Sequence, residues 1–147
     1  MRTKGKTAVV TGGASGIGAA LAEAIVADGG RVVVADINSD AAEAHAAKLG
    51  DAARAIPCNV ADVAGVEAMA TEAWDWLGGV DLVFANAGIS VARPLLKASE
   101  AEFDVTLDVN LKGVWATAKA FATRMMGAGG ASLPDRIGTC AGPATSG

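Results

Sequence analysis

Residues 6–25 read KTAVVTGGASGIGAALAEAI, and three spaced glycines (Gly12, Gly16 and Gly18) join a short apolar run to a stretch with helical spacing. A strand that turns through glycines into a helix exposes unpaired backbone N–H groups and the positive end of the helix dipole, and both favour a pyrophosphate. The spacing is GxxxGxG, whereas the general dinucleotide fingerprint is GxGxxG. Taken alone, the stretch also fits a plain turn between a strand and a helix.

The rest of the chain alternates short β-branched runs with longer Ala-rich segments of helical period. Strands are predicted at 7–10, 31–35, 53–58 and 80–85, and helices at 17–28, 39–49, 62–77 and 99–126. Nearly continuous apolar runs are typical of strands buried on both faces of a parallel sheet. We therefore expect an α/β fold, a doubly wound, Rossmann-like parallel sheet of about five strands with helices on both faces.

Domain organisation follows from length and composition. The chain has 147 residues, of which 52% are hydrophobic, and this suits a single domain over 1–147 with a sizeable core. Residues 127–147 lose the helical period and are expected to be irregular or atypical.

Local sequence signals predict where helices begin and end. Asp62 is a predicted N-cap, Ser99 with Glu102 makes a capping box, and Gly50 lies where a helix is expected to end.

Charge and cysteine content exclude several classes of protein. The net charge is -4 and the basic residues are scattered, so the chain offers no basic face for nucleic acid. Cys58 and Cys140 have no metal-ligand spacing, so we expect no metal site and reduced thiols. No run of about 18 apolar residues is present to span a membrane, and the expected location is cytoplasmic.

An acidic residue supports the pyrophosphate interpretation of the glycines. Asp36 ends the second predicted strand, 18 residues after Gly18 (36 - 18 = 18), close to the roughly 20 residues at which a carboxylate binds an adenosine ribose. The alternative is that Asp36 caps the next helix, although Ser39 and Asp40 are equally suited to that role.

At this point the sequence resembles the short-chain dehydrogenase/reductase family, from Lys6 to about Met126. Thr11 to Gly18 (TGGASGIG) is similar to the cofactor-binding turn of this family. Asp36 is similar to the acidic residue found in the family members that prefer NAD. Cys58-Asn59-Val60 resembles the strand end that lies against adenine, although the family usually has Asp in place of Asn59. Asn86-Ala87-Gly88 is similar to its NAG element, and Asp108-Val109-Asn110 carries the Asn of its catalytic tetrad.

The resemblance implies NAD as cofactor and assigns a set of cofactor-binding residues. These are Thr11, Gly12, Ser15, Gly16, Ile17, Gly18, Asp36, Ile37, Asn59, Val60, Asn86, Ala87 and Gly88. It also implies hydride transfer between the nicotinamide and a small alcohol or ketone.

The catalytic part of the resemblance is incomplete. The family uses a Ser, a Tyr and a Lys four residues after the Tyr, but this chain contains no Tyr. Thr139, Thr145 and Ser146 offer hydroxyls near the end of the chain, and none is assigned as a catalytic residue. Asn110 is the one catalytic candidate, and an alternative is that it only hydrogen-bonds backbone at a helix irregularity.

Three interpretations of the function stay open. The chain is the cofactor half of a short-chain oxidoreductase, a noncatalytic NAD-binding or interaction module, or a nonfunctional product that is truncated or frame-shifted after about Gly130. The 147 residues alone are expected to be nearly inactive, because the proton-transferring Tyr is absent.

The remaining expectations concern assembly and surface. An uncovered face beside helix 99–126 favours a homo-oligomer, with Trp115 or Phe121 near the contact. Trp74 and Trp76 are interpreted as packing residues and His45 as a solvated helix residue. Asp104 and Asp108 are interpreted as a solvated face beside Lys112.

Overall fold

The computed structural model describes residues 4–91 and 93–128 and the backbone of 137–139. The strands form a five-stranded sheet in the order β3-β2-β1-β4-β5, and every pair is parallel. Their bounds are β1 Thr7–Thr11, β2 Arg31–Asp36, β3 Ala53–Pro57, β4 Leu82–Ala85 and β5 Ile137–Thr139. The predicted Rossmann-like fold is confirmed. In this strand order β1 lies at the centre, and its carboxyl end lies between those of β2 and β4.

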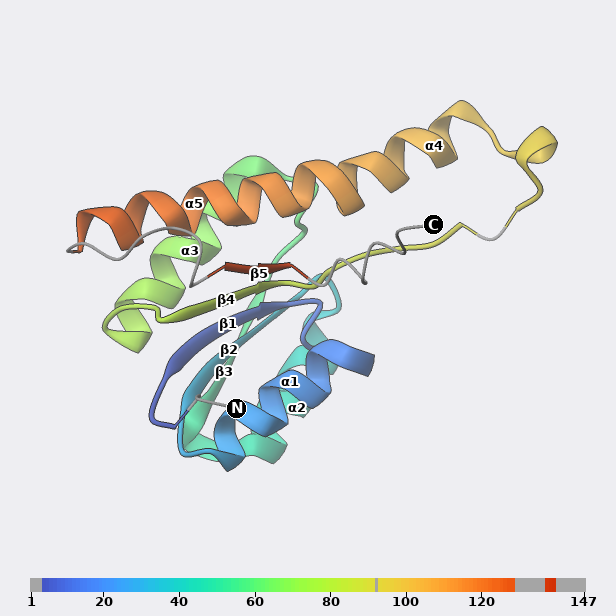
Figure 1. Ribbon diagram of the computed structural model, residues 1–147. Coiled ribbons are helices and arrows are strands. Elements are labelled where there is room, and N and C mark those ends of the chain that lie inside the picture. Colours follow the sequence, from blue (N-terminus) through green and yellow to red (C-terminus); the bar gives the residue numbers. More distant parts are fainter. Residues whose placement is uncertain (1–3, 92, 129–136, 140–147) are drawn as a thin grey trace, which may run out of the picture.

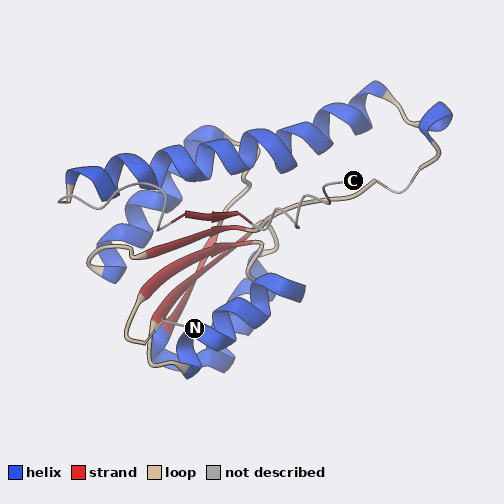
Figure 2. Ribbon diagram, viewed as in Figure 1, coloured by secondary structure: helices blue, strands red, loops and turns tan. Residues whose placement is uncertain are grey.

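Helices cover both faces of the sheet. Figures 1 and 2 show α1 (Gly16–Ala27) and α2 (Ser39–Leu49) below the strands, and α3 (Val63–Leu77) and α5 (Gly113–Gly127) above them. The other helices are α4 (Glu100–Leu107), the short 3-10 turns η1 (Gly50–Ala52) and η2 (Leu95–Lys97), and a π-helical segment, η3 (Asp108–Lys112).

Two hydrophobic cores result, one on each face of the sheet. The central strands β1 and β2 are almost wholly buried, and alternate side chains point to opposite faces. Val9 and Val33 enter the core shared with α3 and α5, whereas Val10 and Val34 enter the core shared with α1 and α2. Burial on both faces explains why these strands read as continuous apolar runs.

The predicted capping residues are found at the helix ends. The Asp62 side chain accepts a hydrogen bond from Ala64 N at the start of α3, and Ser99 with Glu102 forms the capping box of α4. Gly50 follows α2 with φ 74°, a backbone conformation that favours glycine. The cap of α2 is Asn38, whose side chain accepts from Ala41 N, so neither Ser39 nor Asp40 has that role.

The long predicted helix at 99–126 is not a uniform α-helix. Its two α-helical parts, α4 and α5, are joined through η3, where the wider π turn adds a residue. In Figure 1, α4 extends beyond the sheet, followed outward by the loop that carries η2. Phe121 lies on α5 but is fully buried in the core, so of the two residues expected near a contact, Trp115 and Phe121, Phe121 offers no exposed surface.

His45 also differs from its prediction. The sequence predicts a solvated side chain, but only 8% of its surface is exposed, and its Nε2 atom is buried with no hydrogen-bond partner among the described residues. Ala42 and Ala46, on the same helix, are the other buried residues of α2, so His45 belongs to the face of the helix that packs on the protein.

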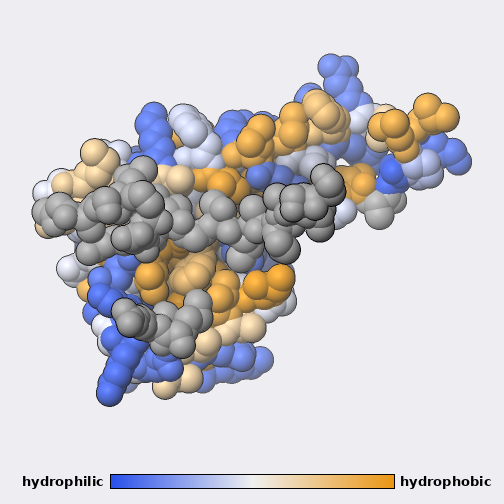
Figure 3. Space-filling model, viewed as in Figure 1, coloured by the Kyte–Doolittle hydropathy of each residue, from blue (hydrophilic) through white to orange (hydrophobic). Residues whose placement is uncertain are grey.

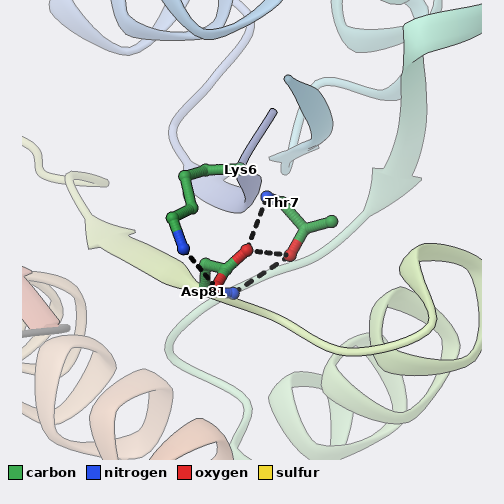
Figure 4. Close-up of polar contacts among 3 residues, drawn as sticks. All are labelled: Lys6, Thr7 and Asp81. Carbon is green, nitrogen blue, oxygen red and sulfur yellow. Dashed lines mark hydrogen bonds and ion pairs between the residues drawn. The ribbon is translucent and has the colours of Figure 1, made fainter. Parts of the chain in front are cut away.

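The amino ends of β1 and β4 are joined by a polar cluster (Figure 4). Asp81 Oδ2 accepts a hydrogen bond from Thr7 N at 3.1 Å, and Asp81 N donates to Thr7 Oγ1 at 3.0 Å. Lys6 Nζ lies 3.1 Å from Asp81 Oδ1. β4 itself begins at Leu82, two residues later than predicted.

Within the described ranges, no helix is both long and apolar enough to cross a membrane. The same residues contain no group of three or more His, Cys, Asp or Glu side chains suited to a metal ion.

Candidate functional site

The glycine turn after β1 is closely packed against the turn after β4. Gly12 has φ +63°, and a Cβ added there would lie 2.8 Å from Ala87 Cα. A Cβ on Gly18 would collide with the carbonyl oxygen of Gly12 and lie 2.7 Å from Asn86 Nδ2. Both positions therefore require glycine for space, which a plain turn between a strand and a helix does not demand.

The first turn of α1 keeps its N–H groups available. Gly16, the first residue of α1, has φ +53°, and the N-cap Ser15 makes no side-chain capping bond. Ile17 is 68% exposed beside it, so an apolar side chain borders the open end of the helix. Uncapped N–H groups at the positive end of the helix dipole suit an anion. A pyrophosphate fits this open end of α1.

Thr11 and Asn86 hold the ends of β1 and β4 together. The buried Thr11 hydroxyl donates to Phe84 O and accepts from Asn86 N and Ala87 N. Asn86 Nδ2 donates to Thr11 O at 3.1 Å and to Gly12 O at 3.2 Å. These bonds fix the glycine turn against the chain that leads to Gly88.

Asp36 ends β2 and faces the same turn. Its Oδ2 accepts from Ala14 N at 3.1 Å, and its Oδ1 accepts from Asn38 N at 3.0 Å. A carboxylate has about four lone-pair positions, so acceptor capacity is left on Asp36. Asp36 thus holds the glycine turn in place while keeping acceptors for a further donor.

The end of β3 supplies Cys58, Asn59 and Val60. Asn59 Oδ1 accepts from Ala61 N at 3.0 Å, and the buried Val60 side chain packs close to Gly113. Burial, with the nearby negative charge of Asp62 as a smaller cause, raises the pKa of the Cys58 thiol to about 11. Cys58 is therefore a neutral thiol near pH 7 and a poor nucleophile.

Asn110 lies in the π-helical segment η3 and bonds backbone through both of its amide atoms. Its Oδ1 accepts from Ile89 N and its Nδ2 donates to Ile89 O, both at 2.8 Å. This is the backbone-bonding role that the sequence left open. Through it, Asn110 fixes the segment just after Gly88, whose hypothetical Cβ would lie 3.4 Å from Asn110 Oδ1.

Most of the predicted cofactor residues line one cavity at the carboxyl ends of the strands. The cavity contains ten of the thirteen: Gly12, Ser15, Ile17, Asp36, Ile37, Asn59, Val60, Asn86, Ala87 and Gly88. Thr11, Gly16 and Gly18 do not line it but shape its wall, as described above. Asn110 lies behind the wall, and its neighbour Val109 lines the cavity.

Three lining residues were absent from the predicted set. Cys58, Ile89 and Val109 each adjoin a predicted residue in the sequence, and this adjacency was the available signal. Among the described lining residues Asp36 carries the one ionised side chain, and none is Lys or Arg.

The hydroxyl-bearing side chains near the end of the chain are not among the described ones. Thr145 and Ser146 lie outside the described residues, as does Cys140. Thr139 belongs to β5, which pairs with β4 next to Ala85.

Comparisons with known proteins identify relatives. Residues 6–133 match the family model described as short chain dehydrogenase. D-threitol dehydrogenase from Mycolicibacterium smegmatis is 41% identical over 135 residues, which are 90% of this chain and 52% of that protein. Sorbitol dehydrogenase from Cereibacter sphaeroides is 40% identical over 88% of this chain and 50% of that protein.

Solved structures agree with this similarity. A short chain dehydrogenase/reductase from Burkholderia phymatum, in complex with NAD, has a TM-score of 0.87 and 31% identity over 95% of this chain and 50% of that one. A 3-ketoacyl-(acyl-carrier-protein) reductase from Brucella melitensis, complexed with NADH, has a TM-score of 0.78 and 33% identity, and covers 80% of this chain and 49% of that one. The chain therefore spans about half the length of the relatives it matches.

Proposed function

Because the chain belongs to the short-chain dehydrogenase family, we propose that its 147 residues form the NAD-binding half of an oxidoreductase that acts on a small alcohol or ketone. The observation that carries the proposal is the cavity in which the glycine turn, Asp36 and the segment 86–88 meet. Bound NAD would supply the hydride acceptor, and NADH the hydride donor.

Each part of the cavity has a role in this proposal. The uncapped N–H groups of α1 hold the pyrophosphate, and Gly12 and Gly18 allow the close packing that fixes the turn before this helix. Asp36 accepts hydrogen bonds from the adenosine ribose. Gly88 and Ile89, held by Asn110, border the opposite half of the dinucleotide. Asn110 is then a positioning residue, because its amide bonds backbone.

The proposal specifies NAD over NADP. The 2'-phosphate of NADP would be repelled by the Asp36 carboxylate. No Lys or Arg is among the described residues that line the cavity, so no cation there offsets the repulsion. Hydrogen bonds to a charged group contribute about 1.5–3 kcal/mol, which corresponds to about 10- to 150-fold in affinity.

Calorimetric titration with both dinucleotides tests this preference. NAD is expected to bind at least about tenfold more tightly than NADP. Asp36→Ala should weaken the binding of NAD and reduce the difference in affinity between the two dinucleotides. Asp40→Ala is the matched control, since Asp40 is an exposed carboxylate in the first turn of α2 and does not line the cavity. Equal affinities, or tighter NADP, would reject the assignment.

A second candidate is a noncatalytic NAD-binding or interaction module. It is favoured by the absence of Tyr from the 147 residues and by the engagement of both Asn110 amide atoms with Ile89. General acid or base catalysis contributes about 10²- to 10⁴-fold to rate, so we expect the 147 residues alone to show little turnover. NADH formation with a panel of alcohols measures this, and ready turnover would contradict it.

A further inference from the structure

We propose that η3 fixes the spacing between two walls of the cavity, and that Gly113 is the positioning residue at one end of it. One wall follows β3 and includes Val60, and the other follows β4 and includes Ile89. The inference rests on the proposed dinucleotide binding. It adds that a change on one side of the cavity is transmitted to the other side through a single π-helical segment.

Asn110 ties η3 to the wall that follows β4. Its Oδ1 accepts a hydrogen bond from Ile89 N and its Nδ2 donates to Ile89 O, both at 2.8 Å. Val109, the preceding residue of η3, lines the cavity itself. A shift of η3 would therefore move one lining residue directly and a second, Ile89, through Asn110.

Gly113 brings the other end of η3 against the wall that follows β3. It is the first residue of α5, it is buried, and its N–H donates to Asp108 O across η3. A Cβ added to Gly113 would lie 2.7 Å from Val60 Cγ2, 3.0 Å from Val60 Cβ and 3.2 Å from Val60 O. A side chain at Gly113 would overlap Val60, so glycine sets how closely η3 approaches this wall.

Of the two partners in this contact, Val60 is held more firmly than η3. Asp62 N donates to Asn59 O at 3.0 Å, which closes a turn around Val60, and the Val60 side chain is buried in the core shared with α3 and α5. By contrast, α4 and η3 contain no buried residue within the described range 100–112. A methyl group added at Gly113 should therefore displace η3 and leave Val60 in place.

The consequence is a coupling across the cavity. A change at Gly113 is expected to reach Ile89, on the opposite wall, because Asn110 lies between them on the same short segment. A glycine that only relieved local crowding would affect Val60 and leave the hydrogen bonds between Asn110 and Ile89 intact.

Residue-resolved amide hydrogen exchange in the ligand-free protein tests this coupling. In Gly113→Ala, the Ile89 amide should exchange at least about tenfold faster than in the unaltered protein, because its acceptor, Asn110 Oδ1, moves away. Asn110→Ala removes this acceptor outright and is the reference for its complete loss. Calorimetric titration of Gly113→Ala with NAD should show binding that is at least about tenfold weaker.

Val60→Ala is the rescue variant. It removes the Cγ2 atom that would lie nearest the added Cβ, so in the Gly113→Ala background it should slow the exchange of Ile89 and strengthen NAD binding by at least about threefold. In the unaltered background the same change only removes apolar surface from the cavity wall and should not strengthen binding. If Gly113→Ala alone fails to fold, the double variant should regain a cooperative thermal melt.

The matched control is Gly127→Ala. Gly127 ends the same helix, and a Cβ there would meet none of the described residues within 4 Å, so its variant should leave the exchange of Ile89 and the affinity for NAD unchanged. Unaltered exchange of Ile89 in Gly113→Ala, or no recovery in the double variant, would overturn the inference.

Failure of the proposed function has a different signature. If NAD does not bind the unaltered protein, the proposed function is wrong. The exchange measurements need no ligand, so they still decide whether η3 couples the two walls.

Discussion

Asp36 and Asp81 are carboxylates at opposite ends of the same sheet, and each holds backbone from a neighbouring segment. Asp36 bonds the N–H groups of Ala14 and Asn38 at the carboxyl end, beside the cavity. Asp81 bonds Thr7 at the amino end, far along the strands from that cavity. Burial alone would raise the pKa of Asp81, but the hydrogen bond from Thr7 N and the Lys6 ammonium outweigh it and lower the pKa below 3.8.

This lowered pKa predicts a pH dependence of stability. A folded-state pKa below the unfolded one stabilises the folded protein above the unfolded pKa, and the contribution is lost as pH falls through the folded pKa. Asp81→Asn should therefore lower the free energy of unfolding by about 1 kcal/mol near pH 7. The difference from the unaltered protein should shrink below the ordinary Asp pKa of 3.8.

Urea unfolding at a series of pH values measures the effect. Asp75→Asn is the control, because Asp75 is exposed on α3. If the difference in free energy of unfolding between Asp81→Asn and the unaltered protein stays constant down to acid pH, the carboxylate charge is not responsible for it.

At the scale of elements, Gly18 allows α1 to pack closely against the glycine turn, and Asn110 ties η3 to the segment after Gly88. Gly18 lets the start of α1 lie against Gly12 and Asn86 with no side chain between them. Asn110 turns its amide to Ile89 from within a π-helical segment, where the chain departs from regular α-helical hydrogen bonding.

Gly18→Ala tests the packing of α1. Ala normally stabilises a helix relative to Gly by up to about 1 kcal/mol. Here the added methyl would collide with Gly12 O, so the variant should instead be destabilised by about 1–3 kcal/mol and bind NAD at least about tenfold more weakly. The change shows in thermal melts and titrations.

Gly127→Ala is the matched control for that variant. Gly127 ends α5, has no positive φ, and a Cβ there would meet none of the described residues within 4 Å. It should be neutral or slightly stabilising. Equal effects of the two substitutions would contradict the close packing of the glycine turn.

The elements also show what the sequence could and could not predict. The strands, the helices between them and the caps at Asp62 and Ser99 follow from local signals such as the apolar runs and the capping box. The π-helical segment and the burial of His45 and Phe121 depend on how α2 and α5 meet the sheet, and tertiary packing of that kind leaves no local signal. The cavity residues that were missed adjoin predicted ones, because a motif indicates a segment more reliably than each side chain in it.

At the scale of the whole molecule, one long apolar stripe is exposed. Figure 3 shows hydrophobic surface along α4 and at its outer end. Phe103, Leu107, Leu111 and Trp115 recur every four residues and are 60%, 40%, 65% and 52% exposed. Side chains four apart share a helix face, and apolar stripes of this length favour association. We therefore retain the homo-oligomer as a proposal, with Trp115 but not Phe121 at the contact.

Light scattering at tens of micromolar checks the assembly. A dimer or larger species is expected, and Trp115→Glu should shift it toward monomer by placing a charge in the contact. Glu72→Ala, a change on the exposed surface of α3, is the control and should leave the mass unchanged. A monomer for the unaltered chain would count against the stripe as an interface.

The central claim is that the carboxyl edge of this sheet binds a nicotinamide dinucleotide, and residue-resolved NMR titration with NAD tests it most directly. Amide signals of Gly12, Ser15, Asp36, Asn59 and Gly88 should shift together with one dissociation constant. Signals of Lys6, Thr7 and Asp81, at the opposite edge, should stay in place. Shifts confined to that opposite edge, or no shifts at saturating NAD, would contradict the account.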